Sequence, residues 1–195
     1  MAGTIGQIYQ LVCHRRVYNG FMRPRLLIAS ALLTLVFVTG CLQTAGPSAP
    51  GAPVTTRAEV VAHTDGDTAH FRLEGGAEEK VRFIGIDTPE VGENAEPLGE
   101  EAAAYTAAAI PVGTTVWLET DAALRDQYGR LLAYVWLEEP ATGEAAEVRE
   151  NMLNARLVLD GYANAYTYPP NVKYTDVLKD LQSEAREAGR GLWAE

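Results

Sequence analysis

Four short polar runs contain the residues of this chain that could act on a phosphodiester bond. They are Asp65–Thr68, Arg82, Asp87–Glu90 and Asp126–Arg130. Carboxylates in these runs are hard oxygen donors that could bind a hard cation. The arginines could clamp a phosphate group through paired hydrogen bonds. Each run is weak support alone, but together they indicate metal-assisted chemistry at phosphorus.

Length and composition indicate one globular domain. A chain of 195 residues with 47% hydrophobic content is long enough for one core, and two domains are not expected. Its two cysteines, Cys13 and Cys41, precede the predicted domain, which excludes a disulfide or a cysteine-based metal site within that domain. From Arg57 onward, 12 lysine and arginine residues face 26 aspartate and glutamate residues, a formal net charge of −14. A nucleic acid would therefore meet a domain of its own charge sign.

Residues 1–40 are predicted to be a cleaved signal peptide. A basic stretch at 22–25 precedes an apolar stretch at 26–39. That apolar length is typical of a signal peptide and is shorter than the roughly 20 residues that span a bilayer. The first 21 residues lack this pattern, so a translation start at Met22 is an alternative to Met1.

The end of this segment resembles the lipobox of bacterial lipoproteins. The run Val38–Cys41 implies that Cys41 becomes the mature N-terminus and carries a diacylglyceryl group, whose two chains suffice for stable anchoring. Residues 41–56 are rich in glycine and proline and are predicted to be a flexible linker. The domain at 57–195 is then expected outside the cytoplasm, anchored to a bacterial-type membrane, or secreted if Cys41 remains a plain thiol.

Alternation of apolar and polar residues predicts three strands, over residues 57–64, 67–74 and 80–86. The pairs Asp65-Gly66 and Gly75-Gly76 are typical of the turns between them. The aspartate of the first turn is expected to be structural. These three strands should form an antiparallel meander.

The expected register of the second hairpin brings two carboxylates together. Pairing centred near residue 77 places Asp67 opposite Asp87 at the open end. Arg82 then has the opposite parity from Asp87, so both can share a site only if the strand is distorted. We expect that distortion, a bulge or a strong twist, near Gly85.

The rest of the domain is predicted to contain two further strands and about three helices. Gly161 should end the middle helix with a left-handed cap, and Trp193 is expected to anchor the C-terminus. Five strands with interspersed helices suggest a small closed barrel, an α+β fold. The expected ranges are 97–109, 150–160 and 175–188 for the helices, and 115–120 and 130–137 for the strands.

These runs resemble the staphylococcal nuclease (thermonuclease) family. The DGDT run, the arginine of the third strand, the DTPE run and the D-x-YGR run occur in that family's order and approximate spacing. The similarity covers about residues 57–193 and includes Gly161–Ala163, Tyr166–Tyr168 and Gly191–Trp193. It implies a five-stranded OB-fold barrel with about three helices, and calcium-dependent hydrolysis of DNA and RNA.

The resemblance also implies a metal site. Asp67 and Asp87 correspond to direct calcium ligands, and Thr88 to a ligand through its backbone carbonyl. Calcium accepts six to eight oxygens, so positions stay open for water and a phosphate oxygen. Glu90 corresponds to the residue that acts on the attacking water, as a base or as a positioning group.

The remaining implied roles concern the substrate. Arg82 and Arg130 correspond to the arginines that bind the scissile phosphate. Tyr166 and Tyr168 resemble nucleotide-contacting tyrosines, suited to stacking on a base, with packing in the core as the alternative. Tyr128 is a further candidate for the same pocket.

Two departures from the family's pattern remove positive charge. Residues 91–97 contain no lysine or arginine, and Gln127 occupies a position that is lysine in a well-known member. Phosphate contacts from basic side chains supply most non-specific affinity for nucleic acid. We therefore expect retained chemistry with weaker binding of long DNA.

Two other functions are compatible with the same sequence. The domain could be a non-catalytic OB-fold module that binds nucleic acid or protein at the cell surface, as degenerate members of the family do. It could also be a calcium-binding envelope protein, which the acidic surface and the tether favour. Retention of all the expected ligands and arginines favours the enzyme, which we expect to be a monomer.

Overall fold

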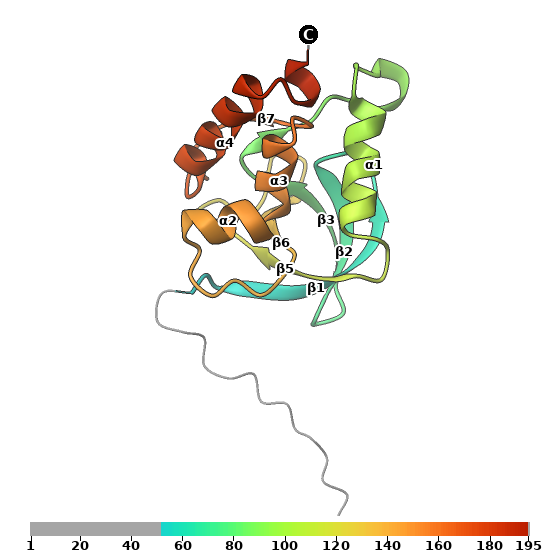
Figure 1. Cartoon of the computed structure of the whole chain (residues 1–195). Coiled ribbons are helices and arrows are strands. Elements are labelled where there is room, and N and C mark those ends of the chain that lie inside the picture. The colour runs from blue at the N-terminus through green and yellow to red at the C-terminus, as the bar shows by residue number, and fades with distance from the viewer. Residues whose placement is uncertain (1–51, 195) are drawn as a thin grey trace, which may run out of the picture. The chain divides into compact units, whose positions relative to one another are not determined.

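The computed structural model describes residues 52–194, which form a barrel with helices packed around it (Figure 1). The predicted signal peptide, Cys41 and most of the predicted linker lie outside the described residues. Their assignments remain predictions. Among residues 52–194, no helix is long and apolar enough to cross a bilayer.

The barrel has five strands in the order β1-β2-β3-β6-β5 and closes where β5 pairs with β1. β3 and β6 run parallel, and the other neighbours are antiparallel. This architecture is the predicted OB-fold. The barrel strands are β1 (Thr55–His63), β2 (Thr68–Leu73), β3 (Glu78–Phe83), β5 (Thr115–Glu119) and β6 (Leu131–Trp136), and a second, two-stranded sheet pairs β4 (Ile86–Asp87) with β7 (Asn164–Ala165).

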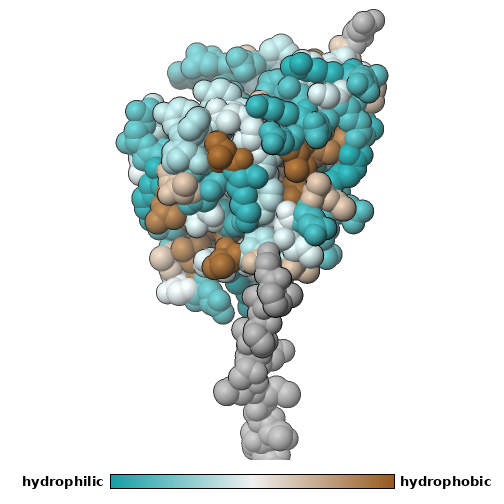
Figure 2. Space-filling view, turned by 90° about the vertical axis from the view of Figure 1, so that its left-hand side faces the viewer, coloured by the Kyte–Doolittle hydropathy of each residue, from teal (hydrophilic) through white to brown (hydrophobic). Residues whose placement is uncertain are grey.

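Alternating side chains fill the barrel. In β3, Val81 and Phe83 are buried while Glu78 and Lys80 are exposed. The Phe83 ring lies 6.3 Å from the buried ring of Phe71 on β2, a separation at which aromatic pairs attract each other. On the face shown in Figure 2, hydrophilic side chains predominate and hydrophobic residues reach the surface only in separate patches.

The observed register of the β2–β3 hairpin differs from the predicted one by four residues. Thr68 lies opposite Arg82, and the backbone N–H of Phe83 donates to the carbonyl of Asp67 at 2.8 Å. The predicted pairing of Asp67 with Asp87 is therefore wrong. The hairpin turn is tight, with its second glycine at φ 85°, and so lies earlier than predicted. An even shift leaves the same side chains facing the core, so the error in register does not change which face of each strand is buried.

A sharp turn separates β3 from β4 at the predicted point of distortion. Gly85 has φ 79°, a left-handed conformation that favours glycine. A Cβ atom there would lie 2.6 Å from Cδ1 of Leu178. The chain therefore leaves the barrel after β3, and β4 carries Asp87 to the pairing with β7.

The first and last predicted helices are confirmed, but the region of the middle helix differs from the prediction. One helix was expected over 150–160; α3 (Leu153–Leu159) lies within that range, whereas α2 (Ala145–Asn151) was not predicted. The two are separated by Met152, which has extended backbone (φ −96°, ψ 121°) and is bridged to Trp136 of β6. Gly161 follows α3 at φ 79°, as predicted. The helices are α1 (Gly99–Ala109), α2 (Ala145–Asn151), α3 (Leu153–Leu159) and α4 (Thr175–Glu187), with short 3₁₀ turns η1 (Gly92–Asn94) and η2 (Gly191–Trp193).

The C-terminus is held against α4 as expected. Leu178, Leu181 and Ala185 are buried along one face of α4. The guanidinium of Arg186 lies 4.1 Å from the centroid of the Trp193 ring. Trp193 thus packs against α4 and anchors the C-terminus, as predicted.

Asn154 fastens α3 to the barrel. It is fully buried; its Oδ1 accepts from the backbone N–H of Val135 at 2.9 Å, and its Nδ2 donates to the carbonyl of Ile84 at 2.8 Å. These bonds join β6 to the turn that precedes β4. The Asn154 amide therefore adds a polar attachment to the apolar packing of α3 in the core.

Replacing Asn154 with alanine should destabilise the domain strongly. Two buried backbone groups would lose their partners, which is expected to lower the free energy of unfolding by about 3 kcal/mol, as measured by urea denaturation. Ser183→Ala on the exposed face of α4 is the control and should change it by less than about 0.5 kcal/mol. Equal losses in both variants would contradict the role assigned to Asn154.

Candidate active site

Asp67 lies at the start of β2 and forms the centre of the candidate site. The residue is only 5% exposed. Its Oδ1 accepts a hydrogen bond from the Thr68 hydroxyl at 3.1 Å, and its Oδ2 accepts from the backbone N–H of Thr88 at 2.9 Å and the Thr88 hydroxyl at 3.1 Å. The backbone N–H of Asp67 donates to Oδ1 of Asp65 at 3.0 Å. Asp65 thus shapes the turn, as predicted.

Arg82 joins the two expected metal ligands. Its Nη1 lies 2.8 Å from Oδ2 of Asp67, and its Nη2 lies 2.7 Å from Oδ1 of Asp87. Nη1 also donates to the carbonyls of Phe83 and Ile86 at 3.1 and 3.0 Å. The Gly85 turn places both carbonyls around the guanidinium. Arg82 and the two hydrogen bonds from Thr88 to Asp67 therefore bring the two carboxylates together, and cross-strand pairing does not.

Burial makes the ionised form of Asp67 unfavourable. Desolvation raises the pKa of Asp67 to about 6, against the lowering effect of Arg82 and of the hydrogen bonds from Thr88. A nearby cation would favour the ionised carboxylate further. A cation bound at this carboxylate would therefore lower its pKa again.

The donor set suits a hard cation with an incomplete protein shell. Asp67 and Asp87 supply carboxylate oxygens around a single guanidinium, and oxygen is the ligand that Ca²⁺ prefers. Within the part of the chain that the structure describes, no three His, Cys, Asp or Glu side chains gather as a ready metal cage. Backbone carbonyls, water and substrate oxygens would have to complete the coordination.

Glu90 follows Asp87 by three residues and is exposed. Its backbone N–H donates to Oε2 of Glu96 at 3.2 Å, and its carbonyl accepts from the N–H of Glu96 at 2.9 Å. Gly99 packs against this carbonyl so closely that a Cβ atom would lie 2.2 Å from it. The backbone of Glu90 is therefore held in place by Glu96 and by the close packing of Gly99. Among residues 52–194, the Glu90 carboxylate makes no hydrogen bond or ion pair, so the structure does not join it to Asp67 or Asp87.

Arg130 is oriented by Asp126. Oδ2 of Asp126 accepts from Nε of Arg130 at 2.6 Å, while Oδ1 accepts from the backbone N–H groups of Tyr128 and Arg130 at 2.9 and 3.0 Å. Burial alone would raise the pKa of Asp126, but these hydrogen bonds outweigh it and lower the pKa. Binding through Nε leaves the two Nη groups directed elsewhere. This is the geometry of an arginine held ready for an anion.

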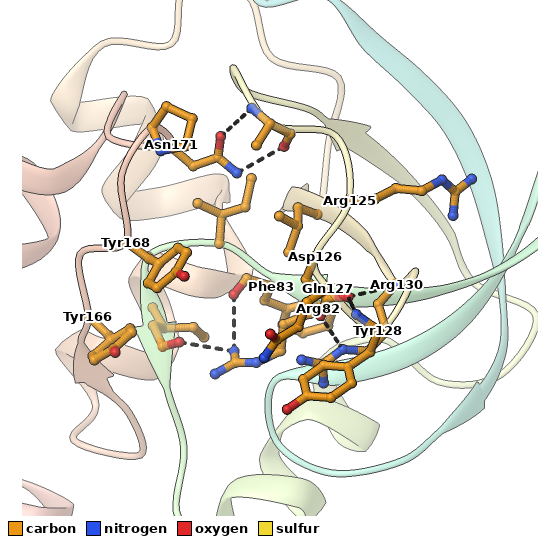
Figure 3. A pocket seen from close by; sticks show the side chains of 16 residues that line it. Arg82, Phe83, Arg125, Asp126, Gln127, Tyr128, Arg130, Tyr166, Tyr168 and Asn171 are labelled. Atoms are coloured by element: carbon orange, nitrogen blue, oxygen red, sulfur yellow. Dashed lines mark hydrogen bonds and ion pairs between the residues drawn. The ribbon is translucent and has the colours of Figure 1, made fainter.

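A pocket of about 350 Å³ connects Arg82, Asp126 and Arg130 to the expected tyrosines (Figure 3). One wall comes from the segment before β6 and the other from the segment after β7, with Arg82 at the floor between them. The pocket is wide enough for the apolar and polar contacts of a small ligand. Its polar and aromatic lining includes Arg82, Arg125, Asp126, Tyr128, Arg130, Tyr166, Tyr168 and Asn171.

All three predicted tyrosines lie at this pocket. Tyr128, Tyr166 and Tyr168 are 76%, 52% and 71% exposed. Core packing, the alternative for Tyr166 and Tyr168, is excluded by that exposure. The Arg130 guanidinium lies 5.6 Å from the centroid of the Tyr128 ring, so one aromatic face and one charge belong to the same wall.

Two polar pocket residues, Arg125 and Asn171, were not predicted. Asp126 belongs to the predicted D-x-YGR run, but no separate role was predicted for it. Arg125 forms a two-point ion pair with Glu79 of β3 at 2.7 and 2.9 Å and also donates to the carbonyl of Gly129 at 2.8 Å. These bonds attach the loop at residues 125–129 to β3. Asn171, on the opposite wall, lies in a segment whose sequence suggested only a loop.

The barrel and its site define an OB-fold protein with an arginine-lined pocket beside two carboxylates. Residues 80–195 match the family model described as staphylococcal nuclease homologue. The thermonuclease of Staphylococcus intermedius is 36% identical over 132 residues, which cover 66% of this chain and 71% of that protein. For the thermonuclease of Staphylococcus hyicus the identity is 33% over 139 residues, covering 70% and 75%. Endonuclease YncB of Bacillus subtilis (strain 168) is 33% identical over 135 residues, covering 67% of this chain and 58% of that protein. The chain belongs to the staphylococcal nuclease family.

The raised pKa of Asp67 predicts that its charge destabilises the metal-free fold. A folded-state pKa of about 6 against the usual 3.8 means that the contribution of Asp67 to stability is full below about pH 4 and is lost as pH rises through about 6. In chelator at about pH 7.5, Asp67→Asn should therefore raise the free energy of unfolding by up to about 3 kcal/mol. Denaturation at about pH 4 is the control, since both proteins are then neutral at this position. A variant less stable than wild type at about pH 7.5 would contradict this account.

Proposed function

We propose that this chain is a calcium-dependent nuclease that hydrolyses phosphodiester bonds in DNA and RNA. The observation that carries the proposal is the sharing of Arg82 by Asp67 and Asp87 at the edge of a pocket that also contains Arg130. Groups that can hold a cation and groups that can hold a phosphate thus lie within one site. Relatives named thermonuclease and endonuclease support nuclease activity.

The residues divide the reaction between them. A Ca²⁺ ion held by Asp67, Asp87 and the Thr88 carbonyl would supply Lewis-acid polarisation and orient a water molecule. The Nη groups of Arg130 are free to bind the phosphate, where negative charge increases in the transition state. Arg82 contributes a second guanidinium from the pocket floor. Glu90, exposed and three residues beyond Asp87, is available to accept the proton of the attacking water.

The pocket walls would bind the nucleotide next to the scissile phosphate. Exposed rings of Tyr128, Tyr166 and Tyr168 provide faces on which any base can stack, so contact need not depend on sequence. Acidic and neutral residues of the loop at 91–97 supply no attraction for the rest of the polymer. Local binding at the pocket, with weak binding of long DNA, is the expected result.

The location of the enzyme is proposed from its N-terminal sequence alone. A signal-peptide pattern followed by the lipobox-like run at Val38–Cys41 supports export and lipid attachment at Cys41. The linker through residue 56 would then separate the domain from the membrane. An exported nuclease would meet nucleic acid and calcium outside the cytoplasm.

Purified residues 52–195 should degrade single-stranded DNA with calcium and lose that activity in chelator. Glu90→Gln and Arg130→Ala should each lower kcat by about 10³-fold or more, because each removes a group that acts in the transition state. Arg72→Ala, which removes an exposed arginine far along β2, is the matched control and should retain activity. Circular dichroism checks that all variants fold.

Three outcomes would count against the proposal. Activity that survives chelation would remove the calcium dependence. Near-normal rates in Glu90→Gln or Arg130→Ala would overturn the roles given to those residues. DNA binding without cleavage under either condition would favour the non-catalytic OB-fold module.

Lipid attachment predicts a membrane fraction that depends on one cysteine. Full-length chain expressed in a bacterium should sediment with membranes and incorporate radiolabelled palmitate, and Cys41→Ser should abolish both. Cys13→Ser is the control and should change neither. Soluble wild-type protein without label would instead support simple secretion.

A further inference from the structure

The two walls of the pocket are separate segments that no barrel strand pairing joins. Residues 121–130 carry Arg130 and Tyr128, whereas residues 166–174 carry Tyr166 and Tyr168. Their relative position fixes how far the tyrosine rings stand from the arginines. The contacts between the two segments therefore decide the width of the pocket.

Asn171 makes the central contact between these walls. Its Oδ1 accepts from the backbone N–H of Ala123 at 2.7 Å, and its Nδ2 donates to the carbonyl of Ala123 at 3.0 Å (Figure 3). The residue is only 5% exposed. One amide thus satisfies both backbone groups of a residue on the opposite wall, as a neighbouring strand would.

A buried carboxylate extends this contact beyond the pocket. Glu119 at the end of β5 is buried and accepts from the Lys173 ammonium, from the Tyr174 hydroxyl at 3.0 Å and from the Trp136 indole N–H at 2.8 Å. The backbone N–H of Lys173 also donates to Oδ2 of Asp121 at 3.1 Å. Residues 171–174 are consequently attached both to the first wall, at Asp121 and Ala123, and to Glu119 at the end of β5.

The other end of the tyrosine wall is attached to the metal side of the site. The N–H of Tyr166 donates to the carbonyl of Gly85 at 2.9 Å, and β7 pairs with β4, where Asn164 lies opposite Asp87. Between these attachments, Tyr168 is 71% exposed and depends on the fixed ends for its position. Loss of either end should leave the rings free to move away from the arginines.

We infer that Asn171, supported by the Glu119–Lys173 pair, is a positioning residue that sets the spacing between the tyrosine and arginine walls and thereby the binding of the substrate base. The inference rests on the proposed nuclease function. It assigns Asn171 no contact with the reacting atoms. Its effect should appear in substrate binding rather than in the chemical step.

Asn171→Ala tests the inference by kinetics on a short single-stranded oligonucleotide. KM should rise about tenfold, the size of one lost base-stacking contact, while kcat stays within about twofold of wild type. The rise should disappear with an oligonucleotide that lacks bases on both sides of the scissile bond. Amide hydrogen exchange should also become faster in residues 166–172.

Glu147→Ala is the matched control. Glu147 fastens residues 141–143 through hydrogen bonds to three backbone N–H groups and one hydroxyl, a similar side-chain clamp that does not line the pocket. This variant should lower Tm without changing KM. Asn171→Asp, which keeps the acceptor and loses the donor, serves if Asn171→Ala does not fold, and should raise KM in the same direction.

The inference is overturned if the Asn171 variant changes KM no more than the Glu147 variant does, or if kcat falls while KM is unchanged. A wild-type chain that does not cleave would refute the proposed function instead. The positioning role is then still tested by fluorescence anisotropy with fluorescein-labelled hexathymidylate. About tenfold weaker binding by the variant supports it, and equal binding refutes it.

Discussion

The site depends on the burial of one carboxylate. Asp67 is removed from water, and its two oxygens accept donors from Thr68, Arg82 and Thr88, which come from three different parts of the chain. Removing a charge from water is costly unless such partners are present. Gly66 is part of the same arrangement, because a Cβ atom there would lie 2.8 Å from Cγ2 of Thr88. A glycine at position 66 therefore leaves the space in which Thr88 can approach and bind the Asp67 carboxylate.

Much of the fold was accessible from the sequence, because strand alternation and glycines act locally. The turn at Gly85 could be predicted from a conflict of parity between Arg82 and Asp87. The register could not, since a shift of four residues preserves the alternation that was its only guide. The break at Met152 was equally hidden. Its neighbours have ordinary helix propensities, and only its bridge to Trp136 in the folded barrel interrupts the helix.

The site shows the same division between local and long-range information. Residue types and order identified the carboxylates and arginines, and the exposure of the tyrosines agrees with their expected place. The route that assembles them was different: Arg82 bridges the two carboxylates where a cross-strand pair was expected. Asn171 was missed because an asparagine in a loop is typical of any turn. Its partner, the backbone of Ala123, lies 48 residues away and leaves no trace in the local sequence.

Competition for Arg82 links the two proposed ligands. In the structure, both terminal nitrogens of Arg82 already contact carboxylates, so an incoming phosphate must compete with Asp67 and Asp87 for them. A cation on those carboxylates would weaken this competition, and a phosphate bound at Arg82 would in turn free the carboxylates for a cation. Such coupling is reciprocal in free energy. In a domain of net charge −14, it offers a physical reason why phosphate affinity need not come from an extended basic surface.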